Sequence, residues 1–532
     1  MAETKQFRAI KGTRDILPPD SAVWDWFERT AREVFESYNF GEIRTPIFEE
    51  TRLFARSVGQ ETDIVSKEMY RFELHGSSLL SAIRVELFER EAWFHNPQAG
   101  STLYWLIRVF AGELRDMMQR GDLARTPESV EAAEKLEPLG QALIRDQKEF
   151  EAKKDHADLL EDRFNANVQS VRHLIRHLDL GEQVALRPEA TASVCRAYIE
   201  NGMHTRPGNV KLYNIGPMFR RERPQKGRYR QFYQVDVEVL GQSDAPGIDA
   251  EVIEMLMEFF RRVGLKKTKL HVNSIGDKNC RPAYVELLRE KLRQVKDRLG
   301  ADSQRRIETN PLRVLDSKVP EEQEIIATLP RISEHLCDAC REHFSQLKRE
   351  LALRGIQYEE NWRLVRGLDY YTRTTFEVTA EGLGSQNAVC GGGRYDGLVE
   401  LLGGPPTKGI GFAIGTDRAI LSIQEAGSAP KLPGSGVYVA WMGQPAYPAA
   451  IGIARKLREA GVSVELPAEE MKFKKSLGLA DKLGARYALI LGEDEVASKT
   501  YTLKRLADAE QMKLREAELL EYLESERRGT RA

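Results

Sequence analysis

The segment from Phe219 to Phe232 concentrates arginines, the side chains best suited to holding a phosphate group. A guanidinium binds phosphate through two parallel hydrogen bonds, and a rigid base can hold it against a reacting phosphorus atom. Proline, glycine and lysine exclude a buried strand here, so strand-like sequences on both sides predict an exposed hairpin loop. An arginine-rich stretch is by itself more often a solvated loop, and other segments must decide between the two interpretations.

Four further segments carry groups that could hold a small polar substrate. Leu186 to Thr191 places a carboxylate and a hydroxyl directly after a strand, which suits an ammonium group. Arg363 to Thr372 joins an Arg-Gly turn to two tyrosine hydroxyls. Gly391 to Gly397 offers close approach of the backbone to a ligand, although an ordinary glycine turn explains it equally well. Gly409 to Arg418 is typical of a small-residue strand that enters a helix.

The sequence predicts strands and helices that could position these groups. β-Branched and aromatic residues alternate with polar ones, as in strands with one buried face. The expected strands cover 67–73, 183–186, 210–215 and 231–240, followed by glycine-punctuated strands in 363–412. A helix is expected over 21–38, where apolar residues recur at spacings of three and four. Pro46 argues against a central antiparallel strand in the extended piece that follows.

Composition limits the class of protein. The chain has 532 residues and a formal charge of -2, from 79 Lys+Arg and 81 Asp+Glu. This length predicts about three or four domains, and the charge balance excludes a histone-like polycation, so any nucleic-acid surface is local. No apolar run approaches the roughly 18 residues of a membrane span, and the polar N-terminus does not resemble a signal peptide. Five scattered cysteines argue for a reducing compartment, and we expect a cytoplasmic protein.

Taken in order, these segments resemble the histidyl-tRNA synthetase family, which belongs to the class II aminoacyl-tRNA synthetases. Four segments of this chain resemble markers of the family: Lys11–Asp15, the Pro46 segment (motif 1), the Arg220 hairpin (motif 2) and the Arg418 segment (motif 3). Residues 364–372 and 388–397 resemble the two histidine-specific signatures. The resemblance covers nearly all of the chain outside residues 75–180.

The resemblance implies an α+β multidomain fold, with a catalytic antiparallel sheet flanked by helices, two helical insertions and a C-terminal α/β anticodon-binding domain. The expected catalytic parts are 1–74 with motif 1, 183–272 with motif 2, and 363–424 with the histidine signatures and motif 3. They are interrupted by a helical insertion specific to this chain at 75–182 and by a second helical domain at 273–362. A linker at 425–436 leads to the anticodon-binding domain at 437–532, whose βαβ order predicts a mostly parallel sheet.

The implied activity is the ATP-dependent ligation of L-histidine to tRNA(His) through a histidyl-adenylate, with Mg2+ accompanying ATP. The implied enzyme is a homodimer that is joined through motif 1. ATP would be bound by Arg220, Glu222, Arg228 and Arg418. Histidine would be bound by Glu189, Thr191, Gln234, Glu238, Arg366, Tyr370, Tyr371 and Tyr395. Arg366 and Arg220 would be catalytic, and the tRNA acceptor end would meet Arg223, Gln225 and Lys226.

Selection of an imidazole ring requires a donor and an acceptor that match its two nitrogens. The family pattern assigns this role to Glu238 and Tyr371. Without the pattern, Glu238 would be a solvent-facing charge on an alternating strand, and either Tyr370 or Tyr371 would be a half-buried core residue.

No structural zinc is expected. Cys337 and Cys340 form one C-x-x-C pair near His335 and His343, but the sequence has no second pair. Helical cysteines of this kind are usually small core hydrophobes.

Three departures from the family pattern stand out. Ala190 occupies a position where the family has glycine, which is tolerated only if its φ angle is negative. Asp417 replaces a longer glutamate before the motif 3 arginine. Residues 75–180 replace a short turn; they carry 14 basic and 18 acidic residues and predict a bundle of three or four helices. This bundle is either peripheral or a module that contacts tRNA or a partner, and its acidity argues against a primary RNA-binding role.

Two other classes of protein share parts of this pattern. A non-catalytic paralogue, such as the regulatory subunit of ATP phosphoribosyltransferase, tends to lose the ATP arginines and the anticodon domain. This chain retains Arg220, Arg366, Arg418 and a C-terminal unit. An RNA-sensing module of the same fold would need an effector domain, for which the sequence has no candidate.

Overall fold

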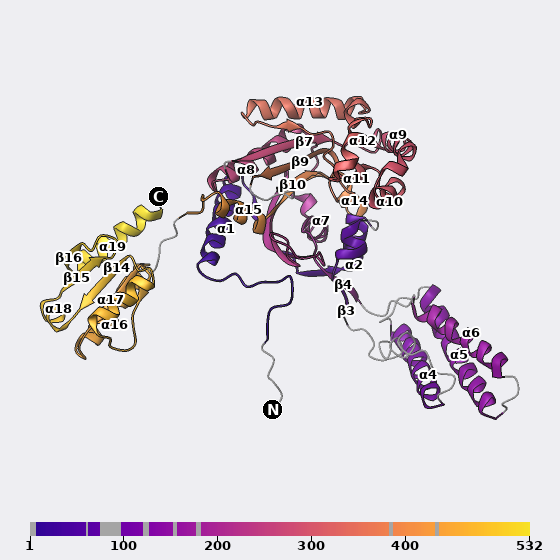
Figure 1. Ribbon diagram of the computed structural model, residues 1–532, viewed down its shortest axis with the longest axis horizontal. Helices are drawn as coiled ribbons and strands as arrows, with labels where there is room; N and C mark the ends of the chain where they lie inside the picture. Colours follow the sequence, from indigo (N-terminus) through magenta and orange to yellow (C-terminus); the bar gives the residue numbers. More distant parts are fainter. Residues whose placement is uncertain are drawn as a thin grey trace. The chain divides into compact units, whose positions relative to one another are not determined.

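The computed structural model describes residues 7–59, 62–74, 97–120, 127–152, 157–176, 182–265, 267–381, 387–430 and 436–531. The chain forms two compact units, Met1–Ala429 and Pro430–Ala532 (Figure 1). Among the described helices, none has the length and apolarity needed to cross a membrane.

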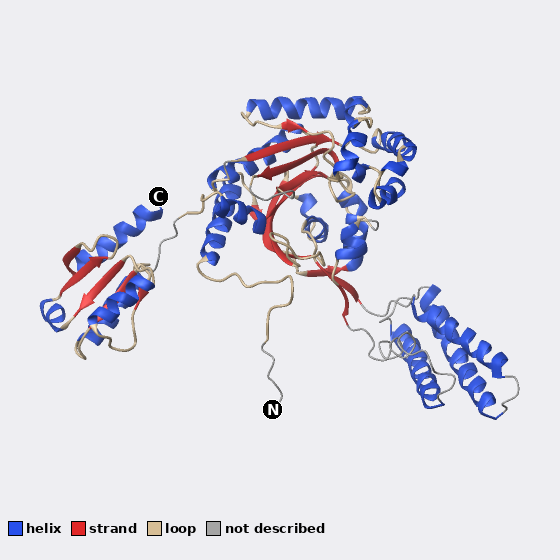
Figure 2. Cartoon of the chain, in the orientation of Figure 1, coloured by secondary structure: helices blue, strands red, loops and turns tan. Residues whose placement is uncertain are grey.

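An eight-stranded sheet forms the centre of the first unit (Figure 2). The strand order is β1-β5-β6-β11-β10-β9-β7-β8, in which the inner pairs run antiparallel and both edge strands pair in parallel. The strands are β1 (Gly41–Glu42), β5 (Val210–Phe219), β6 (Gln231–Gly241), β7 (Thr268–Ser274), β8 (Glu359–Glu360), β9 (Thr372–Ala380), β10 (Ala388–Arg394) and β11 (Lys408–Gly415). The expected antiparallel sheet is therefore confirmed, and parallel pairing is confined to its edges.

Helices cover this sheet with aromatic side chains. The expected N-terminal helix is α1 (Asp20–Ser37), whose Phe27 and Phe35 rings lie 5.0 and 5.8 Å from Phe259 of α8 (Pro246–Arg262). Phe35 also lies 6.2 Å from Phe412 of β11, so the apolar stripe of α1 faces the sheet as its three-and-four spacing predicts. The remaining helices of the catalytic part are α2 (Thr51–Val58), α7 (Thr191–Glu200), α14 (Leu398–Leu401) and α15 (Thr416–Glu425).

A small second sheet carries the first insertion. Its strands are β2 (Phe48–Glu50), β4 (Glu182–Leu186) and β3 (Arg71–Leu74), in that order. The prediction of a strand over 67–73 was wrong at its start, because Ile64–Glu68 forms a π-helical turn and pairing begins at Arg71. Leu74 pairs with Glu182, so residues 75–181 leave and return at one point of a hairpin, where closing a long loop costs little entropy.

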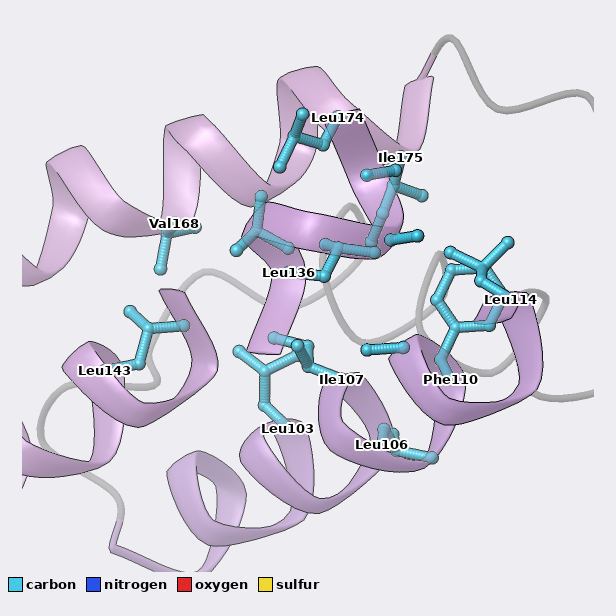
Figure 3. Packing of buried hydrophobic residues seen from close by; sticks show 14 of the residues in the cluster. Leu103, Leu106, Ile107, Phe110, Leu114, Leu136, Leu143, Val168, Leu174 and Ile175 are labelled. Atoms are coloured by element: carbon cyan, nitrogen blue, oxygen red, sulfur yellow. The ribbon is translucent and has the colours of Figure 1, made fainter. Parts of the chain in front are cut away.

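The described part of that insertion contains three helices: α4 (Pro97–Arg120), α5 (Pro127–Ala152) and α6 (Ala157–Arg176). Their apolar faces meet in one core, where Ile107 and Phe110 of α4 lie with Leu136 of α5 and Ile175 of α6 (Figure 3). The buried carboxylate of Asp146 on α5 is paired across the core edge with Arg163 of α6 at 2.6 Å, and it also accepts a hydrogen bond from Asn167. The three-helix content agrees with the predicted bundle.

The second helical block follows β7. It consists of α9 (Arg281–Gln294), α10 (Ala301–Thr309), α11 (Leu312–Leu315), α12 (Gln323–Ala327) and α13 (Asp338–Leu353). Its core joins Tyr284, Leu288 and Leu336 to Tyr371 of the catalytic part, so this block supports one wall of the catalytic unit.

The C-terminal unit is an α/β domain with a mixed sheet of order β13-β12-β14-β15-β16. Its elements are β12 (Val437–Trp441), α16 (Ala446–Glu459), β13 (Val464–Glu465), α17 (Phe473–Lys482), β14 (Tyr487–Leu491), α18 (Glu493–Ser498), β15 (Thr500–Arg505), β16 (Gln511–Arg515) and α19 (Glu516–Arg531). The first three strands of the order pair in parallel, but β14–β15 and β15–β16 pair antiparallel, so the prediction of a mostly parallel sheet was wrong for the second half. The last two add an antiparallel hairpin that the sequence interpretation missed.

Candidate active site

One cavity of about 200 Å³ lies over the central strands of the eight-stranded sheet. Most residues assigned to ATP and histidine line it together: Glu189, Thr191, Arg220, Glu222, Arg228, Gln234, Arg366, Tyr370, Tyr371, Tyr395 and Arg418. Glu238 does not line the cavity, but two lining residues, Thr191 and Tyr395, donate hydrogen bonds to its carboxylate. Arg223, Gln225 and Lys226 do not line the cavity.

The floor of the cavity follows from the register of β6 and β11. On β6, Gln234, Asp236 and Glu238 point to one face because side chains alternate along a strand. Opposite them on β11 are Gly415, Ala413 and Gly411, all of which are small. Polar groups on one strand beside small residues on the next leave an open, polar floor.

Glycines of β10 and β11 make room for the functional side chains. A Cβ atom at Gly391 would overlap the Arg366 guanidinium, and one at Gly411 would overlap the Glu238 carboxylate. Gly393 lies against the Tyr371 ring, and a Cβ atom at Gly393 would stand only 2.9 Å from a ring carbon. Gly391 to Gly393 belong to strand β10, so the alternative interpretation of these residues as an ordinary glycine turn is wrong.

Three arginines converge on one side of the cavity. Arg220 donates from Nε to the Pro188 carbonyl at 2.9 Å, Arg228 pairs with Glu222 at 3.1 Å, and Arg418 donates to the Ala388 carbonyl at 3.1 Å. Burial, together with the charges of Arg228 and Arg220, lowers the pKa of Arg418. A site in which cations repel one another gains stability from a polyanion, so this side suits phosphates.

Glu189 and Thr191 line the cavity where β4 leads into α7. Both Glu189 oxygens accept backbone N–H groups, from Thr191 at 2.8 Å and Ala192 at 3.0 Å, and Tyr370 approaches the same carboxylate at 3.4 Å. Burial raises the pKa of Glu189 in spite of the two backbone donors. Ala190 has a φ angle of -100°, so the alanine fits without the strain of the left-handed region.

Glu238 is held by two hydroxyl groups. Thr191 Oγ1 donates to one carboxylate oxygen at 2.5 Å, and Tyr395 donates to the other at 2.5 Å. The residue is only 2% exposed, and burial raises its pKa well above the ordinary value. The solvent-facing alternative for Glu238 is therefore wrong. Tyr371 is buried at 6% exposure and lines the cavity, with its ring 4.8 Å from that of Tyr370.

The hairpin between β5 and β6 keeps its tip outside the cavity. Arg223, Gln225 and Lys226 are exposed there, and Lys226 forms an ion pair with Glu425 at 2.5 Å. Gly227 closes the turn with a φ angle of +74°, which favours glycine. The loop prediction holds at the tip, whereas Arg220 at its base is largely buried.

Sequence reasoning assigned no role to Asp236, which lines the cavity, or to Arg14, which pairs with the cavity-lining Asp417. Asp236 lines the cavity and accepts from Asn214 at 3.2 Å, and burial raises its pKa to about 7. Its position between Gln234 and Glu238 on an alternating strand was the signal that could have found it. Arg14 pairs with Asp417 at 2.8 Å, and Asp417 also accepts the backbone N–H of Tyr233, so this carboxylate joins the N-terminal segment to the sheet.

Four polar atoms of residues that line the cavity make no hydrogen bond within the part of the chain that the structure describes. They are Glu222 Oε2, Arg228 Nε, Gln234 Oε1 and Arg366 Nε, and all four are buried. Buried polar atoms are nearly always paired, so such atoms mark places where a bound ligand supplies the partner. Two of the atoms are acceptors and two are donors, so the cavity suits a ligand that carries both donor and acceptor groups.

Comparisons with known proteins agree with this architecture. The family model for histidyl-tRNA synthetase matches residues 152–419, and that for an anticodon binding domain matches residues 436–526. The histidine–tRNA ligases of Koribacter versatilis and Solibacter usitatus are 45% and 43% identical, over 97% of this chain and 96% and 99% of theirs. The crystal structure of apo histidyl-tRNA synthetase from S. aureus superposes with a TM-score of 0.65 at 30% identity, covering 98% of this chain and 100% of that chain.

The sheet, its arginine-lined cavity and the C-terminal unit define a class II aminoacyl-tRNA synthetase. The chain belongs to the histidyl-tRNA synthetase family.

Proposed function

We propose that the chain joins L-histidine to tRNA(His) in two ATP-dependent steps, and that the cavity over β6, β10 and β11 forms the histidyl-adenylate. The observation that carries this proposal is the pairing, in one cavity, of three converging arginines with a Glu189 end suited to an ammonium group. The family is ATP-dependent and binds tRNA, which supports the reaction class.

The chemistry of activation explains the arginines. The histidine carboxylate attacks the α-phosphorus of ATP in line with the departing pyrophosphate, which gains negative charge as it leaves. Cations held by the protein before the reaction need no reorganisation, and this gives them their large effect on rate. Arg220 and Arg418 are fixed by backbone carbonyls, and Arg366 by Glu377 at 2.6 Å.

The histidine end supports selection of the amino acid. Glu189 and Thr191 would hold its ammonium group, and Tyr371 and Gln234 reach the same cavity. Because Thr191 and Tyr395 occupy both oxygens of Glu238, we propose that Glu238 positions these two hydroxyl groups and exchanges one of them for an imidazole N–H on binding. A matched polar pocket rejects analogues that leave its groups unpaired.

Magnesium would enter with ATP as a substrate complex. Glu222 lies between Arg220 and Arg228 on the phosphate side, where it offers the carboxylate oxygens that Mg2+ prefers.

We also propose a cytoplasmic homodimer. Three apolar side chains near motif 1 are exposed: Ile47, just before β2, at 45%, and Phe48 and Phe72 of the small sheet at 49% and 39%. Such an apolar surface favours burial against a second copy. The exposed tip residues Arg223, Gln225 and Lys226 would meet the acceptor end of the tRNA, where phosphate contacts position the strand.

Arg220→Lys is expected to lower histidine-dependent ATP–pyrophosphate exchange by at least about tenfold, because lysine keeps the charge and loses the two-pronged contact. The matched control is Arg221→Lys, since Arg221 is exposed and does not line the cavity. The function is wrong if the unmodified protein shows no histidine-dependent exchange. The assignment of Arg220 alone is wrong if the lysine variant exchanges at the unmodified rate.

Deleting the chain between Gly76 and Asp179 is expected to leave exchange within about threefold of the full chain, because β3 and β4 pair without the bundle. Exchange and tRNA charging would be measured separately on the same preparation. Retained exchange with lost charging would assign the bundle a tRNA role, and retention of both would make it peripheral. Loss of exchange in a folded variant would contradict the expectation.

A further inference from the structure

A second group of reactive side chains lies outside the cavity, where β7 ends and two helices begin. Asp277 and Cys280 come from the loop before α9, and Cys337 and Cys340 come from the start of α13. Their ligand atoms all lie within 4.8 Å of one another, which holds for no other His, Cys, Asp or Glu group among the described residues.

The separations match the coordination shell of one small metal ion. Cys280 Sγ lies 3.9 Å from Cys340 Sγ and 3.6 Å from Asp277 Oδ1, and Cys337 Sγ lies 3.9 Å from the same oxygen. In a tetrahedral zinc site with Zn–S bonds of about 2.3 Å and a Zn–O bond of about 2.0 Å, the ligands stand about 3.8 and 3.5 Å apart. We therefore propose that Asp277, Cys280, Cys337 and Cys340 bind one structural Zn2+.

The surroundings hold the ligands in place. The other Asp277 oxygen faces Asn279 Nδ2 at 3.3 Å and Arg373 at 3.8 Å, so Oδ1 turns toward the sulfur atoms. Such outer contacts orient metal ligands and are part of a built site. Gly276 has a φ angle of +66°, and a Cβ there would lie 2.7 Å from Cys280 Sγ, so glycine is needed both for the turn and for the space.

In the sequence, the C-x-x-C of Cys337 and Cys340 has no second C-x-x-C to complete a zinc site. The second pair is an Asp-x-x-Cys from a distant loop, and the neighbouring histidines take no part. His343 lies instead 3.1 Å from the Asp244 carbonyl, and His335 packs against the Tyr284 ring at 5.7 Å. Burial also fits a structural site, because Cys280 and Cys340 are 8% and 0% exposed while Cys337 is partly open to solvent.

This site supports the wall that carries the histidine signature. Ile275 donates its N–H to the Arg373 carbonyl, and Arg373 donates to the Gly276 carbonyl, each at 2.8 Å. Arg281, next to Cys280, donates to the Tyr371 carbonyl. Loss of the metal is therefore expected to raise the KM for histidine more than that for ATP. This consequence rests on the proposed function, whereas the metal site itself does not.

The test is the zinc content of the full chain, purified without an affinity tag and under reducing conditions. We expect about one zinc per chain by elemental mass spectrometry, and at least about tenfold less in Cys280→Ser and Cys340→Ser. Cys195→Ala is the matched control, because Cys195 is equally buried but lies in α7, outside the group. Cobalt added to metal-free protein should give thiolate charge-transfer absorption, which Cys280→Ser should lose.

If the serine variants fail to fold, the unmodified chain still tests whether zinc is bound by cysteine thiolates. Titration of its thiols with an organomercurial should release one zinc per chain to a chromogenic chelator. Three results would overturn the proposal: no zinc either as purified or after incubation with Zn2+ and reductant, full zinc retention in both serine variants, or an intact mass lower by two hydrogens that maps to a Cys280–Cys340 disulfide.

Discussion

Replacing Arg366 by alanine is expected to lower kcat/KM for histidine-dependent exchange by about 10² to 10³-fold, the loss usual for one preorganised donor to developing charge. The guanidinium lines the cavity, is fixed to Glu377 at 2.6 Å, and occupies the space left by Gly391. Burial acts to lower the pKa of Arg366, but the neighbouring groups, Glu377 foremost, together outweigh burial and raise this pKa. The positive charge of Arg366 is therefore present at every pH of interest. The measurement is exchange at varied histidine and ATP concentrations.

Two further variants accompany Arg366→Ala: a control at a nearby arginine, and a variant that keeps the Arg366 charge but loosens the position of its side chain. Arg363→Ala is the control three residues away, because that side chain bonds to Gln323 outside the cavity and should change the rate little. Glu377→Gln keeps the Arg366 charge and loosens its fixation, and a loss of about tenfold is expected. Exchange by Arg366→Ala within tenfold of the unmodified enzyme, with an unchanged thermal unfolding profile, would remove Arg366 from the catalytic group.

Gly411→Ala is expected to destabilise the catalytic unit by about 3 kcal/mol or more and to raise the KM for histidine at least about tenfold. A methyl group there would overlap both the Glu238 carboxylate and the backbone carbonyl of Val237. Since β6 and β11 are paired at this point, backbone displacement would also move the hydroxyls of Thr191 and Tyr395. Thermal unfolding and histidine-dependent exchange would measure the two effects.

The stability control lies on the same strand. At Gly415 the nearest atom to an added Cβ is the Val389 carbonyl oxygen at 3.9 Å, an ordinary contact, so Gly415→Ala should unfold at nearly the unmodified temperature. Equal unfolding temperatures for the two alanine variants would show that the space behind Gly411 is not needed.

Short stretches of sequence were sufficient to predict much of the candidate site. The Arg220 hairpin, the small-residue strand before Arg418 and the carboxylate after β4 each depend on a few consecutive residues, and all three meet in the cavity. Alternation along β6 likewise determines that Gln234, Asp236 and Glu238 share a face. The C-terminal hairpin of β15 and β16 was missed although apolar and polar residues alternate in both strands, with Tyr501 opposite Leu514 and Leu503 opposite Met512. Runs this short, of six and five residues, give a weak periodic signal.

The family, the order of the motifs and the charge of their loops follow from the amino-acid sequence alone, because these depend on residue types that are close along the chain. The tertiary structure alone decided which glycine makes room for which side chain, and that Glu238 is satisfied by two hydroxyls. It also brought Cys280 and Cys340, 60 residues apart, to within 3.9 Å. Contacts of this kind depend on how helices and strands pack in space, and no local spacing encodes them.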